Sequence, residues 1–462
     1  MNLLYIGAGF VGACSAAVSA NSGHRALVYD INEVRVNMLN SGDRDTIESC
    51  LHEKGLGDLL VKHKDLITFT TDYKKVESFL DTCDAIFMCL PTPEIAETGE
   101  SNLSYYFAAA ETLAEAMKKR NNSEQSKYII VINKSTVPID MIDRTLGVLK
   151  EHGVKNAGTV SNPEFLVEGT AVRDSLSPDR VVIGANSQKD FDIARRIYQR
   201  FYDAPGVQYI EVNPKEAAAG KLLANYYLYH KLMACYDVIG RTCEAFEDLS
   251  FENVRKILTS DDRIGSWGFY NSLYAGGSCL IKDARSLSHQ LQTAGKGASL
   301  VDEISSANKR QLELFLSRAK NEANFDWKDK VVGLVGLSFK RDTNDIRNAA
   351  SIEIAKFLSE KGIKRLQCFD PVAGEHFQTL YPISDSVVYE SNEHDAMKGA
   401  DVVIIATDWP QFRGLGDVLL YETKKPILIM DGRRMLQHRY ADLQKEGYDI
   451  IGVGSRFLKG KK

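Results

Sequence analysis

A glycine-rich turn near the start of the chain constrains its fold more than any other feature of the sequence. Gly7-Ala8-Gly9-Phe10-Val11-Gly12 follows the apolar run at residues 3–6 and precedes a stretch with helical periodicity. Glycines at these positions permit a tight strand-to-helix turn and let backbone N–H groups approach a pyrophosphate. Asp30 ends the next apolar run, where a carboxylate can bind a ribose 2′-hydroxyl and repel a 2′-phosphate. The pattern predicts NAD binding; the alternative is a turn that only packs a helix on a strand.

Short apolar runs recur in the first and last thirds of the chain. Runs rich in β-branched residues are typical of strands buried on both faces of a parallel sheet. We expect such strands at residues 3–6, 26–29, 85–88, 128–132, 180–183, 331–335, 366–369, 402–406 and 427–430. The predicted fold class is therefore α/β, with two doubly wound Rossmann-like domains.

The segment between these two parts has a different pattern. Asn213-Pro214-Lys215-Glu216 is a strong helix start, because Asn can cap, Pro suits the first turn and Glu occupies the third helical position. We expect one long helix from residue 214 towards residue 246, followed by more helices. A helix of that length usually buries a face against another domain or subunit, so a homo-oligomer, at least a dimer, is expected. The predicted domains are residues 1–212, 213–320 and 321–462, with the central one helical.

Composition narrows the class of protein. The net charge of −5 and the pI near 6.1 give no sign of a surface for nucleic acid or for a membrane. The eight cysteines include no Cys-x-x-Cys pair, and the nine histidines form no metal-ligand spacing, so no metal is expected. Glycines interrupt the apolar N-terminal stretch, and no Lys or Arg precedes it, unlike a signal peptide. A cytoplasmic protein is expected.

One cysteine lies in a reactive context. Ala275-Gly276-Gly277-Ser278-Cys279-Leu280-Ile281-Lys282-Asp283 resembles a loop that enters a helix. A helix N-terminus and a nearby lysine would lower a thiol pKa from about 8.5 and make thiolate available. The Asp283 carboxylate would follow one turn later on the same face, where it could assist an acyl-enzyme. The ordinary alternative is a buried, inert cysteine.

Other polar residues fall where ligands bind in such folds. Lys221 and Asn225 share a face of the expected long helix, where a lysine could stabilise an oxyanion, unless both are surface residues. Glu164, Glu168 and Thr136 follow expected strand ends, at the edge of the sheet where ligands bind. Carboxylates there could act as general bases or could only cap helices. Arg35 could contact a cofactor phosphate or be a solvated helix residue.

Taken in order, these segments resemble the UDP-glucose/GDP-mannose dehydrogenase family over nearly the whole chain. The resemblance is carried by the glycine-rich turn and by segments 134–138, 162–169, 221–225, 276–283, 336–340, 370–371 and 407–409. It implies an NAD domain, a helical dimerisation core and a C-terminal domain that binds a UDP-sugar. It also implies two successive oxidations of a nucleotide sugar at C6, through a cysteine thiohemiacetal and thioester.

The resemblance assigns roles to individual positions. The catalytic set is Cys279, Lys221, Asn225, Asp283, Glu164 and Thr136. The cofactor set is Gly7, Gly9, Phe10, Val11, Gly12, Asp30, Arg35, Thr92, Thr136, Glu168, Lys282 and Arg347, with Lys134 on the same side. The substrate set is Glu164, Phe165, Leu166, Lys221, Asn225, Arg263, Tyr270, Gly276, Phe339, Lys340 and Arg433.

Segments 262–265, 269–271 and 431–434 resemble the UDP-glucose branch, while GDP-mannose and UDP-N-acetylhexosamine stay open as substrates. A one-step alcohol dehydrogenase and a non-catalytic nucleotide sensor are less favoured. Several positions depart from the family pattern: Ala275 stands for an aromatic residue, Ile281 for Pro and Glu94 for Thr, and His52-Glu53-Lys54-Gly55-Leu56 for Tyr-Glu-Pro-Gly-Leu.

Overall fold

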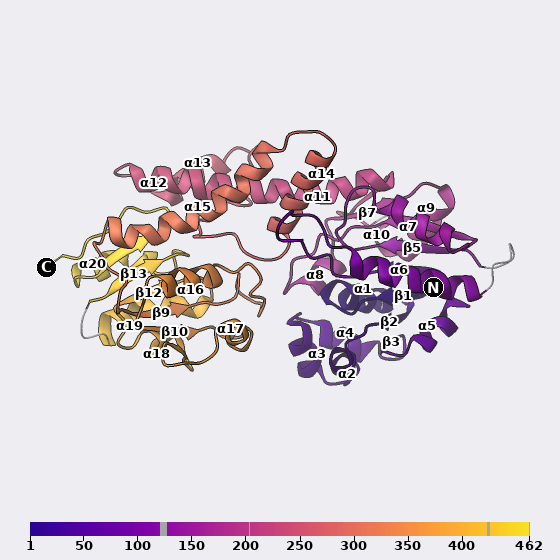
Figure 1. The fold of residues 1–462 in the computed structure, drawn as a ribbon, viewed down its shortest axis with the longest axis horizontal. Helices are drawn as coiled ribbons and strands as arrows, with labels where there is room; N and C mark the ends of the chain where they lie inside the picture. Colours follow the sequence, from indigo (N-terminus) through magenta and orange to yellow (C-terminus); the bar gives the residue numbers. More distant parts are fainter. Residues whose placement is uncertain (121–126, 203, 423–425, 462) are drawn as a thin grey trace. The chain divides into compact units, whose positions relative to one another are not determined.

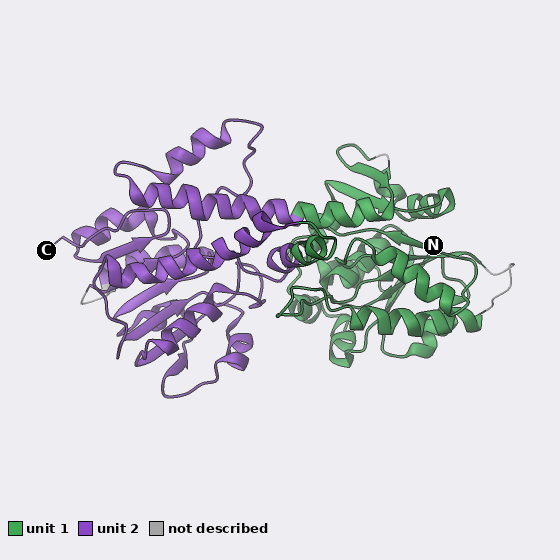
Figure 2. Cartoon of the chain, turned by 45° about the horizontal axis from the view of Figure 1, so that its top comes forward, with its two compact units in different colours: residues 1–224, 286–296 green, residues 225–285, 297–462 purple. Residues whose placement is uncertain are grey.

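The computed structural model describes residues 1–120, 127–202, 204–422 and 426–461. The chain forms two compact units, residues 1–224 with 286–296 and residues 225–285 with 297–462 (Figure 2). Each unit contains one sheet with helices packed against it (Figure 1). The predicted α/β class with two Rossmann-like sheets is confirmed. The three-part division of the chain stays a prediction.

The first unit has an eight-stranded sheet in the order β3-β2-β1-β4-β5-β6-β7-β8. Its strands are β1 Asn2–Ile6, β2 Arg25–Tyr29, β3 Ile67–Thr70, β4 Ala85–Met88, β5 Ile129–Asn133, β6 Ala157–Ser161, β7 Arg180–Gly184 and β8 Gln208–Val212. All neighbours pair in parallel except β6 and β7, where Ser161 faces Gly184 in an antiparallel bridge. Leu3 and Leu4 of β1 belong to apolar clusters on opposite faces, as expected for a sheet covered on both sides.

The helices of the first unit alternate with these strands. They are α1 Phe10–Asn21, α2 Glu33–Leu39, α3 Arg44–Leu51, α4 Leu56–Lys62, α5 Tyr73–Leu80, α6 Ser104–Arg120, α7 Met141–Glu151, α8 Ala171–Leu176, α9 Gln188–Ile197 and α10 Gln199–Tyr202. Gly7 has φ +104, and a Cβ added to Gly12 would lie 2.0 Å from the Gly7 carbonyl oxygen. Only glycine therefore permits this turn to bring α1 so close to the sheet.

The predicted long helix is confirmed, with one feature that the sequence did not indicate. It comprises α11 Pro214–Met233, a π-helical segment η1 Ala234–Gly240 and α12 Arg241–Ala245. Asn213 and Glu216 form the predicted start: the Asn213 side chain accepts from the Glu216 N–H, and the Glu216 carboxylate accepts from the Asn213 N–H.

The second unit has a six-stranded parallel sheet in the order β11-β10-β9-β12-β13-β14. Its strands are β9 Val331–Val335, β10 Arg365–Phe369, β11 Val387–Tyr389, β12 Val402–Ile405, β13 Leu428–Asp431 and β14 Asp449–Gly452. Further helices along the chain are α13 Phe251–Thr259, α14 Leu280–Thr293, α15 Ser299–Asn321, α16 Ala350–Glu360, α17 Gly374–Leu380, α18 Glu393–Met397, η2 Pro410–Gly414, α19 Leu415–Glu422, η3 Gln437–Arg439 and α20 Tyr440–Lys445.

Asp370, just after β10, stabilises the turn that follows β9. Its carboxylate accepts hydrogen bonds from Leu337 N–H, Ser338 N–H and the Trp409 indole N–H. The Ser338 hydroxyl also donates to it, as do the N–H groups of Val372 and Ala373. These donors fix the start of the loop that follows β9 in the second sheet.

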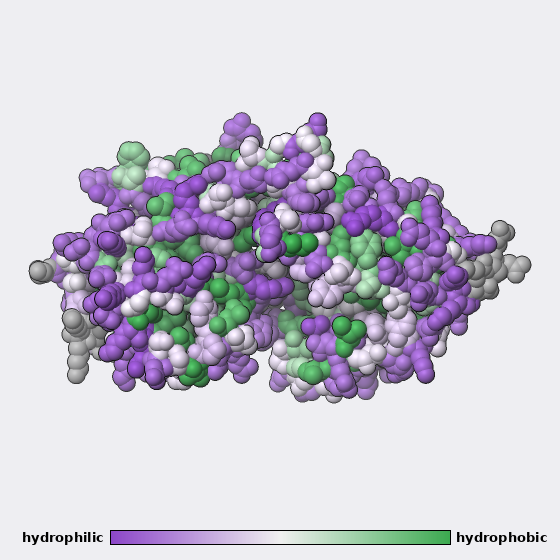
Figure 3. Space-filling view, in the orientation of Figure 1, coloured by the Kyte–Doolittle hydropathy of each residue, from purple (hydrophilic) through white to green (hydrophobic). Residues whose placement is uncertain are grey.

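The hydropathy of the surface is mixed, with polar residues in the majority on the face shown in Figure 3. Apolar side chains are scattered among them on each unit. Within the described residues, none of the helices combines the length and the hydropathy that crossing a membrane requires.

Candidate active site

The glycine-rich turn and Asp30 lie together at the carboxyl end of the first sheet. The Asp30 carboxylate accepts from the Ala8 N–H at 2.6 Å and pairs with Arg35 at 3.3 Å. Nothing lies within 4 Å of the position that a Cβ on Gly9 would take, so the start of α1 faces open space. A pyrophosphate fits in this space, with a ribose next to Asp30. The structure places Arg35 against Asp30, and no phosphate contact is needed to explain its position.

Two apolar side chains next to Asp30 were not identified from the sequence. Ile31 is 83% exposed and Val34 is 70% exposed, although both are large and apolar. Ile31 follows the acid directly, and Val34 lies in the first turn of α2. The signal in the sequence was an apolar residue immediately after the acid at the entry to α2.

The loops that follow β4 and β5 are joined to one another. The Thr92 hydroxyl donates to the Thr136 carbonyl oxygen at 2.7 Å. The Ser135 hydroxyl donates to the Leu90 carbonyl oxygen and accepts from the Leu90 N–H. Thr92 and Thr136, both predicted to face the cofactor, are therefore held together by direct contact.

Glu164 and Lys221 form a buried ion pair. The Lys221 Nζ lies 3.1 Å from the Glu164 Oε1, and both side chains are less than 10% exposed. The second carboxylate oxygen accepts from the Leu166 N–H at 2.6 Å, and the Lys221 ammonium lies 5.2 Å from the centre of the Phe165 ring. A hydrogen-bonded partner makes burial of each charge tolerable. The predicted substrate residues of the first unit thus form one cluster.

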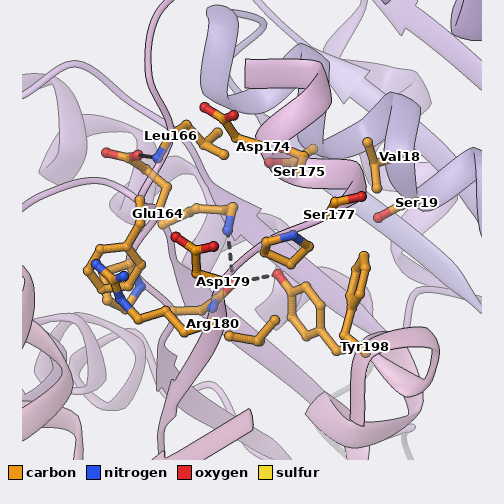
Figure 4. Close-up of a pocket in the computed structure, with 18 of the residues that line it drawn as sticks. Val18, Ser19, Glu164, Leu166, Asp174, Ser175, Ser177, Asp179, Arg180 and Tyr198 are labelled. Atoms are coloured by element: carbon orange, nitrogen blue, oxygen red, sulfur yellow. Dashed lines mark hydrogen bonds between the residues drawn. The ribbon is translucent and has the colours of Figure 1, made fainter. Parts of the chain in front are cut away.

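A cavity of about 240 Å³ extends from this cluster towards α1 (Figure 4). In it, the Asn162 Oδ1 accepts hydrogen bonds from the Lys134 ammonium, at 3.0 Å, and from the Tyr198 hydroxyl. Burial lowers the pKa of Lys134 and raises that of Tyr198 well above its usual range. Asn162 was noted only as the start of the 162–169 segment, and Tyr198, between α9 and α10, was not identified from the sequence.

In the second unit, Cys279 caps the N-terminus of α14. Its carbonyl oxygen accepts the Asp283 N–H at 2.9 Å, the first hydrogen bond of the helix. The predicted loop-to-helix transition is confirmed. Among the eight cysteines, Cys279 alone is exposed, whereas Cys50 is partly buried and the other six are buried. The buried alternative is wrong for this position.

Asp283 is a buried carboxylate with two partners. It is 1% exposed and accepts from the Asn225 amide at 2.6 Å and from the Lys282 ammonium at 2.6 Å. Asn225, 58 residues earlier in the chain, is itself 6% exposed. The surface alternative is therefore wrong for Asn225, and for Lys221 at 5% exposure.

The loop before Cys279 packs on the segment that follows β9. A Cβ on Gly277 would lie 2.8 Å from the Phe339 ring, and Gly277 has φ +89. The Gly277 N–H donates to the Arg347 carbonyl oxygen, and the Asn348 amide donates to the Gly277 carbonyl oxygen. A Cβ on Gly276 would also collide with this segment, at 2.6 Å from the Asn348 carbonyl oxygen. Two glycines are therefore required for this close approach.

Three further predicted substrate residues of the second unit, Arg433, Tyr270 and Arg263, lie in two different settings. Arg433 donates to the Ser272 hydroxyl and to Asp408, and it lines a cavity of about 500 Å³ together with Tyr270. Arg263 contacts Asp261 on its own loop and is 90% exposed. The Thr-Asp-Trp motif contained Asp408 but did not indicate that it holds Arg433.

Other predicted positions and departures have simpler surroundings. The Arg347 guanidinium pairs with Asp345 at 2.6 Å, and the Lys340 ammonium lies 5.7 Å from the centre of the Phe339 ring. Glu168 is partly buried in the loop before α8. Ala275 is held by Asn308, which accepts its N–H and donates to its carbonyl oxygen, and Glu94 forms an isolated β-bridge with Ser101.

The described residues contain no group of three or more His, Cys, Asp or Glu side chains that could hold a metal ion.

Three family models match the chain. Residues 1–202 match the NAD binding domain of the UDP-glucose/GDP-mannose dehydrogenase family, residues 215–310 its central domain and residues 333–438 its UDP binding domain. A UDP-glucose 6-dehydrogenase of Haloferax volcanii is 32% identical over 445 residues, 95% of this chain and 98% of that protein. One of Pseudomonas aeruginosa is 30% identical over 462 residues, 98% of this chain and 97% of that protein. The solved structure of a UDP-glucose dehydrogenase from Pyrobaculum islandicum has a TM-score of 0.82 at 28% identity, covering 95% of each chain.

Proposed function

This chain belongs to the UDP-glucose/GDP-mannose dehydrogenase family, and from that premise we propose that it oxidises C6 of UDP-glucose to a carboxylate in two NAD-dependent steps. One observation carries the proposal: Cys279 is exposed at the start of α14, one turn before the buried carboxylate of Asp283. A one-step alcohol dehydrogenase needs no such thiol. The relatives of known activity at about 30% identity favour UDP-glucose as the sugar nucleotide.

The chain's own residues fit the cofactor. The N–H groups at the start of α1, next to Gly9, would hold the pyrophosphate, and Asp30 would accept hydrogen bonds from the ribose. This turn is completed by Phe10, Val11 and Gly12, and the adjacent strand ends carry Thr92 and Thr136. We also assign to the cofactor side four residues from other segments: Arg35, Glu168, Lys282 and Arg347. When bound, NAD⁺ supplies the hydride acceptor for both oxidations.

The proposed chemistry uses the thiol as a nucleophile. The sugar alcohol loses a hydride and a proton to give the aldehyde, and the Cys279 thiolate then adds to the aldehyde carbon. The resulting thiohemiacetal loses a second hydride to give a thioester. Water attacks the thioester, the carbon–sulfur bond breaks, and the carboxylate leaves with Cys279 restored as a thiolate.

The buried charges would assist these steps. The Lys221 ammonium and the Asn225 amide would stabilise the oxyanion that forms when sulfur or water adds to the carbonyl. Glu164, Thr136 and Asp283 would orient water and accept protons. The nucleotide sugar would be bound by Phe165, Leu166, Arg263, Tyr270, Gly276, Phe339, Lys340 and Arg433.

The test is the amount of NADH formed per UDP-glucose consumed, measured for the wild type, Cys279→Ser and the control Cys50→Ser. Cys50 is the other cysteine that is not fully buried. We expect two NADH per sugar in the wild type and in the control, and none beyond a first oxidation in Cys279→Ser. One NADH per sugar, unaffected by Cys279→Ser, would overturn the thioester route. Two NADH with GDP-mannose or a UDP-N-acetylhexosamine, and none with UDP-glucose, would overturn the substrate.

We also propose a homo-oligomer, at least a dimer, formed through the helical part of the second unit. Tyr227, Val238, Phe246 and Ile257 are each more than 60% exposed, although large apolar side chains gathered in one segment are usually covered. We expect a dimer by sedimentation velocity, and monomers for Val238→Lys combined with Ile257→Lys. Tyr421→Lys, at an equally exposed position on α19, should stay dimeric. A monomeric wild type would contradict the proposal.

A further inference from the structure

A fully buried carboxylate outside the proposed machinery contacts the loop that carries Glu164. Glu53, between α3 and α4, is 0% exposed. Its two carboxylate oxygens accept hydrogen bonds from the Gly169 N–H at 2.7 Å and the Ala171 N–H at 2.8 Å. These partners lie 116 and 118 residues further along the chain, so the contact is tertiary.

The loop between β6 and α8 spans residues 162–170 and contains every first-unit position assigned to the sugar except Lys221. Its turn requires φ +87 at Gly169, directly at the Glu53 contact. From within α8, Asp174 accepts from the Val167 N–H and from the Thr170 hydroxyl. At the end of the loop next to α8, Glu53 adds a contact from a different segment of the first unit.

The charge of Glu53 suits these donors. An ionised carboxylate accepts hydrogen bonds at both oxygens and donates none. A glutamine of the same shape would turn an NH₂ group towards one of the two N–H donors. A buried charge is retained where it is hydrogen-bonded, and Glu53 meets that condition through backbone groups.

We propose that Glu53 is a positioning residue, which fixes the 162–170 loop so that Glu164 and Leu166 face the reacting sugar carbon. The proposal rests on the function proposed above. Glu53 itself would touch neither substrate nor cofactor, and it would act through the backbone of Gly169 and Ala171. The Glu164 carboxylate, held by Lys221 at 3.1 Å and by the Leu166 N–H at 2.6 Å, would lose its alignment if the loop shifted.

The expected size of the effect follows from alignment. A misplacement of about 1 Å in a catalytic group can cost about 100-fold in rate. We therefore expect Glu53→Gln to lower kcat by about 10- to 100-fold per folded protein, with a smaller change in KM. Glu53→Asp keeps the charge but withdraws the carboxylate by one methylene, and it should lower kcat in the same range.

Asp190→Asn is the matched control. Asp190 is also a buried carboxylate of the first unit, at 4% exposed, but it accepts from the Tyr128 and Ser187 hydroxyls at the start of α9. Its substitution should lower thermal stability without lowering kcat per folded protein. The folded fraction of each variant is measured by circular dichroism at the assay temperature.

Hydrogen exchange followed by mass spectrometry supplies a second readout that does not depend on turnover. Peptides covering residues 164–171 should exchange at least tenfold faster in Glu53→Gln than in the wild type, while peptides from β1 and β5 should not change. Wild-type kcat and wild-type exchange in both Glu53 variants would overturn the proposal. So would a loss of kcat that only follows the folded fraction, as for a purely structural residue.

The outcomes also separate this proposal from the proposed function. If the wild type makes no NADH with any nucleotide sugar, the function fails, whatever the exchange data show. If neither Glu53 variant folds, slow exchange of the Gly169 and Ala171 amides in the wild type supports the contact, and fast exchange overturns it.

Discussion

Replacing Lys221 by methionine removes the ammonium from a buried ion pair and leaves the Glu164 carboxylate without it. The two atoms lie 3.1 Å apart, and the side chains are 6% and 9% exposed. At that separation, and with an effective dielectric constant of about 20, the gross attraction is about 5 kcal/mol. The cost of desolvating both groups offsets much of this attraction in the wild type. In Lys221→Met the Glu164 carboxylate still has its desolvation cost but no longer has the ammonium that compensates for it. The expected loss in the free energy of unfolding is about 3–5 kcal/mol.

The assay is urea-induced unfolding of a double-mutant cycle at one protein concentration. Glu164→Gln combined with Lys221→Met removes both charges, so the double variant should be more stable than the sum of the single losses predicts, by about 2 kcal/mol. Lys215→Met is the control on the same helix. Its pair with Asp143, at 2.9 Å, is more than half exposed on both sides, so its loss should be below about 1 kcal/mol.

Two results would refute the reasoning. The first is a Lys221→Met variant that loses no more stability than Lys215→Met. The second is additivity of the two single variants in the cycle, which would mean that the pair is not coupled in the folded protein. Either result would also remove the argument that the ammonium is held ready for an oxyanion before substrate binds.

Three further predictions follow from single contacts. Asp30→Asn removes the charge that would repel a 2′-phosphate, so kcat/KM with NADP⁺ relative to NAD⁺ should rise at least about tenfold in steady-state assays; an unchanged ratio would count against the ribose contact. Asn348→Ala removes the hydrogen bond to the Gly277 carbonyl oxygen and places alanine at φ +50, so the rate of NADH formation should fall about tenfold. Asn348→Gly loses the same hydrogen bond but adopts that φ freely, so its rate should fall less. Equal losses in the two variants would exclude backbone strain as the cause. Burial lowers the pKa of His24 from 6.5, so the unfolded chain takes up its proton first and stability should fall as pH drops below about 6.5. His24→Gln should flatten that fall in urea unfolding at pH 5 to 7, and an unchanged slope would be the contrary result.

Strand and helix positions were predictable where local pattern and tertiary role agree. The β-branched runs of β5 and β12 gave correct strands because both faces of those strands are buried. The strands β3, β8, β11 and β14 were not predicted, and β6 was expected only through its end before residue 162, without bounds. β6, for example, reads Ala-Gly-Thr-Val-Ser, and its strand conformation depends on its neighbours in the sheet.

The same distinction applies to the site. The Gly-Gly-Ser-Cys run was enough to predict that Cys279 starts a helix, because it describes neighbouring residues. The partners of Lys221 and Asn225 were not predictable, since Glu164 and Asp283 lie 57 and 58 residues away. The π-helical segment had no signal either, because its packing of Gly240 against Asn271 depends on a loop that follows in the chain.

An aspartate follows the second strand of each sheet, but the two aspartates have different hydrogen-bond partners. Asp30 and Asp370 follow equivalent strands, next to β1 and next to β9. Asp370 accepts six hydrogen bonds from its own surroundings, whereas Asp30 accepts two from backbone groups and one from Arg35. A ribose diol next to Asp370 would have to displace donors that define the turn itself. We therefore expect one dinucleotide per chain, bound at the first sheet and not at the second.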